Sequence, residues 1–138
     1  MRRTFPRDPY YKEDVEGGGR QKLRRVLIAF TIYDPEICYV QGMNFIVAQL
    51  LLHCSETFAF WLFVALIEDC GLREVYEPQL TGLFKHCKII DVLVQANFPD
   101  LHERLISFNL RANVYASGWI VGLFASVIPF EHMGDFFD

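Results

Sequence analysis

The run MNFIVAQLLL at residues 43–52 decides the fold class of this chain of 138 residues. Its apolar side chains fall on every side of a helical wheel instead of forming one stripe. A helix of this kind belongs in the middle of a bundle, where other helices surround it. The run therefore predicts the central helix of an all-α domain.

The segment before this run predicts an amphipathic helix over residues 20–33. Its apolar face has members at positions i, i+4 and i+7, and these are Leu23, Leu27 and Phe30. The tripeptide Asp34-Pro35-Glu36 ends the helix, because proline has no N–H for the helical ladder and restrains the residue before it. Residues 36–42 then form a short connection that ends at Gly42, directly before the central run.

Downstream of the central run, the sequence predicts four more helices and the beginning of a fifth where it stops. Ser55 is a suitable N-cap for the first, which runs to about Asp69 before Gly71 supplies a left-handed stop. The other three cover residues 80–97, 100–108 with Asp100 as a candidate cap, and 119–127. Residues 1–19 predict irregular structure. No segment combines strict alternation with a hairpin turn, so the seven helical segments predict an all-α fold of bundled helices without a sheet.

The composition excludes several classes of function. Hydrophobic residues make up 52% of the chain and charged residues 22%, which is typical of a packed domain and not of a disordered segment. The net charge of −4 argues against nucleic acid as the main partner, because binding to phosphates needs a basic surface. The most apolar stretches, residues 45–67 and 114–130, are interrupted by polar residues or by glycine and proline. Neither therefore predicts a membrane span, which needs roughly 20 apolar residues.

The four cysteines contain no CxxC pair, which argues against a zinc ribbon, and the four histidines show no metal-ligand spacing. We therefore expect no metal site. Because the N-terminus shows no signal peptide, we expect reduced thiols in a cytoplasmic protein.

The sequence also lacks the motifs of a hydrolase that acts alone. The run Gly17-Gly18-Gly19-Arg20 lacks the GK[ST] ending and the preceding strand of a phosphate-binding loop. No GxSxG nucleophile elbow occurs. Gln41 is of more interest, because it stands beside Gly42 at the beginning of the predicted central helix. Two interpretations are open: the side chain is held rigidly for a partner, or it satisfies backbone groups of its own loop.

Three motifs resemble one known family. Residues 39–44, Tyr-Val-Gln-Gly-Met-Asn, resemble the YxQGMN signature of the TBC family of Rab GTPase-activating proteins, and residues 3–6, Arg-Thr-Phe-Pro, resemble the end of its IxxDxxRTFP motif. The third motif resembles the SxW…LF…P-x-E…RIWD stretch and comprises Ser117-Gly118-Trp119, Leu123-Phe124, Pro129, Glu131 and Asp138. Because the three occur in order at compatible spacing, the resemblance covers essentially the whole chain.

The resemblance implies a mechanism in trans. TBC proteins supply an arginine and a glutamine to a GTP-bound Rab GTPase, so Arg3 and Gln41 are the expected catalytic residues. The resemblance places Thr4, Tyr39, Gly42, Met43, Asn44 and Trp119 in supporting or partner-binding positions. The chain would be an activator and not itself an enzyme, without a cofactor of its own, since the partner carries GTP and magnesium. A role in vesicle trafficking follows, with recruitment to endomembranes through the partner.

The chain departs from the family pattern at several positions. The Ile and Asp of IxxDxxR would lie at or before Met1, so we expect residues 1–138 to be a partial domain that lacks the first and last helices. Cys38 stands where the family usually has glycine, and residues 135–137, Asp-Phe-Phe, stand where Arg-Ile-Trp is usual. Two alternatives therefore stay open: a TBC-like scaffold that binds a GTPase without accelerating hydrolysis, and a helical interaction fragment unrelated to GTPases.

Overall fold

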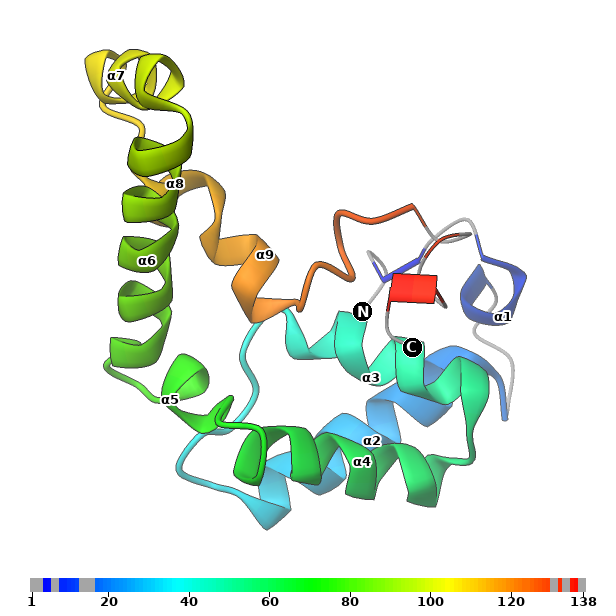
Figure 1. Ribbon diagram of the computed structural model, residues 1–138. Coiled ribbons are helices and arrows are strands. Elements are labelled where there is room, and N and C mark those ends of the chain that lie inside the picture. The colour runs from blue at the N-terminus through cyan, green and yellow to red at the C-terminus, as the bar shows by residue number, and fades with distance from the viewer. Residues whose placement is uncertain (1–3, 6–7, 13–16, 130–131, 133–134, 137–138) are drawn as a thin grey trace.

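The computed structural model describes residues 4–5, 8–12, 17–129, 132 and 135–136. Within these residues the chain forms helices and no strand, which confirms the all-α prediction (Figure 1). The helices are α1 (Pro9–Lys12), α2 (Gly19–Tyr33), α3 (Met43–His53), α4 (Glu56–Glu68), α5 (Arg73–Tyr76), α6 (Thr81–Asn97), α7 (Pro99–Ser107), α8 (Ala112–Tyr115) and α9 (Ser117–Val121).

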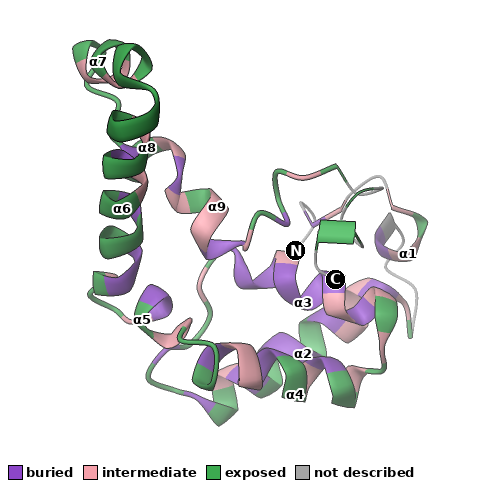
Figure 2. Ribbon diagram, in the orientation of Figure 1, coloured by how far each residue is buried: buried purple, intermediate pink, exposed green. Residues whose placement is uncertain are grey.

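Helix α3 is the centre of a three-helix bundle with α2 and α4, in which each helix contacts the other two. Figure 2 shows α3 as a mostly buried helix. Its buried residues point in several directions and comprise Met43, Asn44, Ile46, Val47, Ala48, Gln49 and Leu51. The prediction of a central helix is confirmed, because a helix that is apolar all round can shield its side chains only by packing on several sides.

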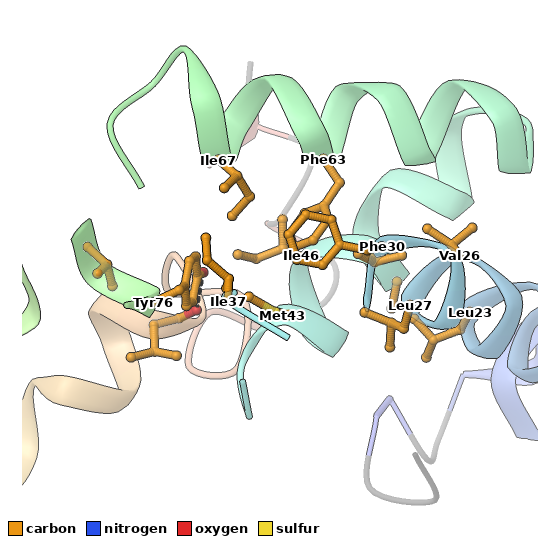
Figure 3. Packing of buried hydrophobic residues seen from close by; sticks show 14 of the residues in the cluster. Leu23, Val26, Leu27, Phe30, Ile37, Met43, Ile46, Phe63, Ile67 and Tyr76 are labelled. Atoms are coloured by element: carbon orange, nitrogen blue, oxygen red, sulfur yellow. Dashed lines mark hydrogen bonds between the residues drawn. The ribbon is translucent and has the colours of Figure 1, made fainter. Parts of the chain in front are cut away.

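The core of this bundle forms where α2 and α4 meet over α3. Phe30 of α2 packs edge-to-face on Phe63 of α4, with ring centroids 4.8 Å apart, and Ile46 of α3 lies beside both rings (Figure 3). The predicted face of α2 is confirmed, since Leu23, Leu27 and Phe30 are all buried. Such an aromatic pair contributes about 0.5–1.5 kcal/mol beyond the burial of its apolar area.

Helices α5 to α9 form an arm beside the bundle, whereas α1 contacts α2 (Figure 1). Helix α6 extends away from α4, and α7 lies at its far end (Figure 1). The chain then returns through α8 and α9, both of which contact α6. Helix α9 thereby comes back next to the beginning of α3, while α5 contacts both α6 and α9.

Several predicted helix ends agree with the structure. The Ser55 hydroxyl accepts the N–H of Phe58 at 3.4 Å and caps α4, and Gly71 has a φ of +72° at the turn that follows this helix. Asp34 is the C-cap of α2, whose backbone N–H donates to the carbonyl of Phe30. These signals are reliable because they act within one or two turns of the chain.

The prediction of a buried helix over residues 119–127 is wrong. Helix α9 ends at Val121, and Leu123 and Phe124 have left-handed φ values of 45° and 61°. Val127 is half exposed. Gly118 and Gly122 lower the helix propensity of this stretch, so its apolar character reflects packing against other elements and not a continuous helix.

Other local predictions also need correction. Phe98 and not Asp100 is the N-cap of α7, because Pro99 takes the first helical position, where no N–H is needed. Single-turn helices were not predicted, and α1 lies in a segment expected to be irregular. One turn is too short to display a helical period. The expected helix at the end of the chain falls largely outside the described residues.

All four cysteines are free thiols, at positions 38, 54, 70 and 87. In the part of the chain that the structure describes, no helix combines the length and the apolar character needed to cross a membrane.

Candidate functional site

The candidate site is the turn that joins α2 to α3 and carries Gln41. Gln41 is exposed, whereas the next two residues, Gly42 and Met43, are buried. The sulfur of Met43 accepts the N–H of Val40 at 3.3 Å, which ties the turn to the first residue of α3. Gln41 itself makes no hydrogen bond to any described residue. This geometry favours a side chain presented outward over one that satisfies its own loop.

The side chain of Asn44 organises this turn from within the molecule. Its Oδ1 accepts the N–H of Gly42 and the hydroxyl of Tyr39, each at 3.1 Å. Partial burial raises the pKa of Tyr39, so this hydroxyl keeps its proton and remains a donor at neutral pH. Because both donors converge on one buried oxygen, the backbone after Gln41 and the side chain of Tyr39 before it are anchored to α3.

The same amide reaches the beginning of the chain. Asn44 Nδ2 donates to the Thr4 hydroxyl at 2.8 Å, and both residues are buried. Next to this bond, the ring of Phe5 packs edge-to-face on Phe45 of α3, with centroids 5.7 Å apart. Arg3 lies outside the described residues. The structure nevertheless brings the residue that follows Arg3 in sequence into contact with the motif that contains Gln41.

The stretch that carries the third motif also contacts this turn, through Val121 of α9. Gly42 adopts a φ of +123° and a ψ of −39°, and a methyl group added to it would lie 2.8 Å from the carbonyl oxygen of Val121 in α9. That carbonyl accepts the hydroxyl of Tyr76 at 2.7 Å. Trp119 is half-buried and packs between the rings of Tyr115 and Phe124. These ring contacts hold Trp119 against α8 and the turn that follows α9.

Replacing Gly42 by alanine is expected to lower the free energy of unfolding by about 2–4 kcal/mol. The new methyl group would meet both the side chain and the backbone of Val121, and the backbone conformation at residue 42 is one that L side chains rarely adopt. Chemical denaturation of both proteins, followed by circular dichroism, measures the difference.

Gly71→Ala is the matched control for this prediction. Gly71 also has a positive φ, of +72°, but nothing lies within 4 Å of an added methyl group. We expect a loss of about 1 kcal/mol there, from backbone strain alone. Equal losses at the two glycines would show that the contact between Gly42 and Val121 contributes nothing.

The sequence did not predict two features of this site, helix α5 and the carbonyl group of Val121. Neither carries a local signal, because Tyr76 and Val121 are brought together only by the return of the chain after α8. Among the described residues, no group of three or more histidine, cysteine or acidic side chains is placed to hold a metal ion. At the turn itself, Gln41 presents an exposed carboxamide.

Comparison with known proteins identifies the class to which this fold and site belong. The model of the Rab-GTPase-TBC domain family matches residues 1–138. The chain therefore belongs to the RabGAP-TBC domain family.

Individual relatives agree with this assignment. The chain is 34% identical over 139 residues to GTPase-activating protein GYP5 of Saccharomyces cerevisiae, a match that covers 100% of this chain and 15% of the relative. It is 33% identical to Rab GTPase-activating protein tbc-11 of Caenorhabditis elegans, over 95% of this chain and 14% of the relative. It is 34% identical to human TBC1 domain family member 1, over 99% of this chain and 12% of the relative. The chain thus spans a small part of the length of the curated relatives that it matches.

Proposed function

We propose that this chain activates GTP hydrolysis by a Rab-type small GTPase, with Arg3 and Gln41 supplied in trans to the nucleotide site of the partner. Family membership supports the activity, and the relatives GYP5 and tbc-11 are named as GTPase-activating proteins. The partner would bring GTP and magnesium, so the chain itself would contribute side chains and no cofactor.

The chemistry of the reaction matches these two residue types. Hydrolysis needs a water molecule held in line with the γ-phosphate, and charge that develops on the transferred phosphoryl group must be neutralised. A carboxamide such as that of Gln41 can accept a hydrogen bond from this water and also donate one. The guanidinium of Arg3 is permanently charged and offers a rigid fork of donors to phosphate oxygens.

The observation that carries the proposal is the hydrogen bond between Thr4 and Asn44. Two residues of one reaction site must approach the same phosphate, although Arg3 and Gln41 are far apart in sequence. The bond joins the neighbour of Arg3 to the amide that also accepts the N–H of Gly42, the residue after Gln41. This arrangement supports a single site built from both motifs, since positioning within about an ångström governs the rate of such reactions.

The test is single-turnover GTP hydrolysis by a panel of purified Rab proteins, each loaded with GTP and mixed with the full chain. We expect at least one Rab to hydrolyse GTP faster, by about 10²-fold or more, at saturating concentrations of the chain. An unrelated small GTPase outside the Rab group is the control and should be unaffected. A folded chain that accelerates none of the Rab proteins would refute the proposal.

A second candidate function is a scaffold that binds a Rab GTPase without accelerating hydrolysis. Cys38 favours it, because this residue occupies a left-handed conformation, with a φ of 57°, in the loop that carries Gln41. The strain at a non-glycine residue could change how Gln41 is presented. Binding of a Rab protein loaded with a non-hydrolysable GTP analogue, together with an unchanged hydrolysis rate, would favour the scaffold.

The location of the protein follows from the same proposal. A Rab activator would act in the cytoplasm and would meet the membranes of the vesicle-trafficking system through its partner.

A further inference from the structure

The loop that carries Gln41 is folded around the carboxylate of Asp34. One oxygen, Oδ1, accepts the backbone N–H groups of Glu36 and Ile37, each at 3.2 Å, and the Asp34 carbonyl accepts the N–H of Cys38 at 3.1 Å. The side chain of Ile37 is buried in the core. The first half of the connection between α2 and α3 is therefore a compact turn and not a free loop.

Arg73 of α5 holds this turn from outside. Its Nη1 donates to the second oxygen of Asp34, and its Nη2 donates to Glu36 Oε2 at 2.8 Å. The fork of the guanidinium thus bridges two carboxylates of one loop, which a lysine ammonium cannot reproduce with fixed geometry. Burial of Asp34 raises its pKa, but hydrogen bonds from Arg73 and from the backbone N–H groups outweigh this effect and lower the pKa. The carboxylate is therefore ionised at neutral pH.

The other end of the same short helix supports the second half of the loop. Tyr76 is buried and donates to the carbonyl of Val121, against which Gly42 packs. In Figure 3, Tyr76 lies beside Ile37 of the connection and Met43, the first residue of α3. Helix α5 therefore contacts the connection before Gln41 through Arg73 and supports the residue after Gln41 through Tyr76 and Val121.

We infer that Arg73 is a positioning residue for Gln41, which it serves by fixing the Asp34–Glu36 turn at the base of the catalytic loop. This inference rests on the proposed function, because it assumes that Gln41 contributes to hydrolysis. In this role Arg73 acts through the loop, because its guanidinium is paired with Asp34 and Glu36. Its removal should therefore lower the maximal rate of stimulated hydrolysis and leave the concentration of the chain at half-saturation unchanged.

The experiment is a double-mutant cycle on stimulated GTP hydrolysis with the full chain. Arg73→Gln should lower the maximal rate about tenfold, and Arg73→Lys about threefold, because lysine keeps the charge opposite Asp34 but loses the fork. Arg73→Lys also gives a readout should Arg73→Gln fail to fold. In a Gln41→Ala background, both substitutions should change the rate by less than about twofold, since the side chain they position is gone.

Arg25→Gln is the matched control. Arg25 makes a comparable two-point ion pair, to Glu56 at 2.6 and 2.8 Å, but joins α2 to α4 away from the loop. The Arg25→Gln substitution should change the maximal rate by less than about twofold in both backgrounds, as expected for an exposed ion pair.

Two results would overturn the inference, and they differ from failure of the proposed function. If the losses at Arg73 are equally large with and without Gln41, or if they appear in the half-saturating concentration, Arg73 acts independently of Gln41. If Gln41→Ala leaves the rate unchanged, the proposed role of Gln41 fails and this inference fails with it.

Discussion

Replacing Arg3 by alanine is expected to lower the chain's acceleration of Rab GTP hydrolysis by a factor of at least about a hundred. Arginine fingers contribute about 10³–10⁵ in rate, or roughly 4–7 kcal/mol of barrier. The loss should appear in the maximal rate, because the guanidinium matters most when charge develops in the transition state. Single-turnover hydrolysis at saturating concentrations of the chain measures it.

Two further variants separate the role of Arg3 from general electrostatic attraction. Arg2→Ala removes the same charge one position earlier and should change the rate by less than about threefold, since Arg3 and not Arg2 directly precedes Thr4. Arg3→Lys keeps the charge but loses the fork, so it should recover only a small part of the rate. Equal losses at positions 2 and 3 would mean that the basic N-terminus attracts the GTPase without a specific finger.

Replacing Gln41 by alanine is the second substitution expected to have a large effect, with a loss of tens-fold or more in the maximal rate. Gln41 is exposed on a turn, and the residues on either side of it are anchored. Truncation should therefore remove the proposed contact with the attacking water without disturbing the fold. The melting temperature of the variant should therefore stay close to that of the parent chain, as measured by circular dichroism.

Gln41→Glu and Gln95→Ala complete this test. Glutamate has nearly the same shape, but it cannot donate a hydrogen bond when ionised and would bring a negative charge toward phosphate, so its loss should equal or exceed that of alanine. Gln95 is an exposed glutamine on α6. Its replacement should leave the rate unchanged within about twofold. A Gln41→Ala variant that retains full activity would refute the proposed role of Gln41 in hydrolysis.

The helical elements were largely predictable because their signals are local. The face of α2 repeats with the period of an α-helix, and Ser55 and Gly71 satisfy or redirect backbone groups within one turn of the chain. The prediction for the stretch after Trp119 was wrong because apolar character alone does not define a helix. Its apolar residues resembled a buried helix, but two glycines and the left-handed backbone at Leu123 and Phe124 turn the chain instead.

The candidate site was predicted in part. Gln41 and its anchoring residues lie in one continuous motif, residues 39–44, but the sequence left open whether the Gln41 side chain is presented to a partner or satisfies its own loop; the structure shows it exposed. The link between Thr4 and Asn44 could not be expected from local patterns, because it joins residues far apart in sequence. The same holds for Arg73, which lies in a single-turn helix with no periodic signal.

The sequence by itself determined the longer helices, the end signals at Asp34, Ser55 and Gly71, and the motifs that place the chain in its family. These properties depend on backbone preferences and on side-chain periodicity over a few turns. Only the tertiary structure decided what surrounds Gln41: Asn44 bonded to Thr4, Val121 packed on Gly42, and Arg73 bridging Asp34 and Glu36. Such contacts arise when distant segments pack against one core, and the sequence records them as isolated polar residues or glycines without a local partner.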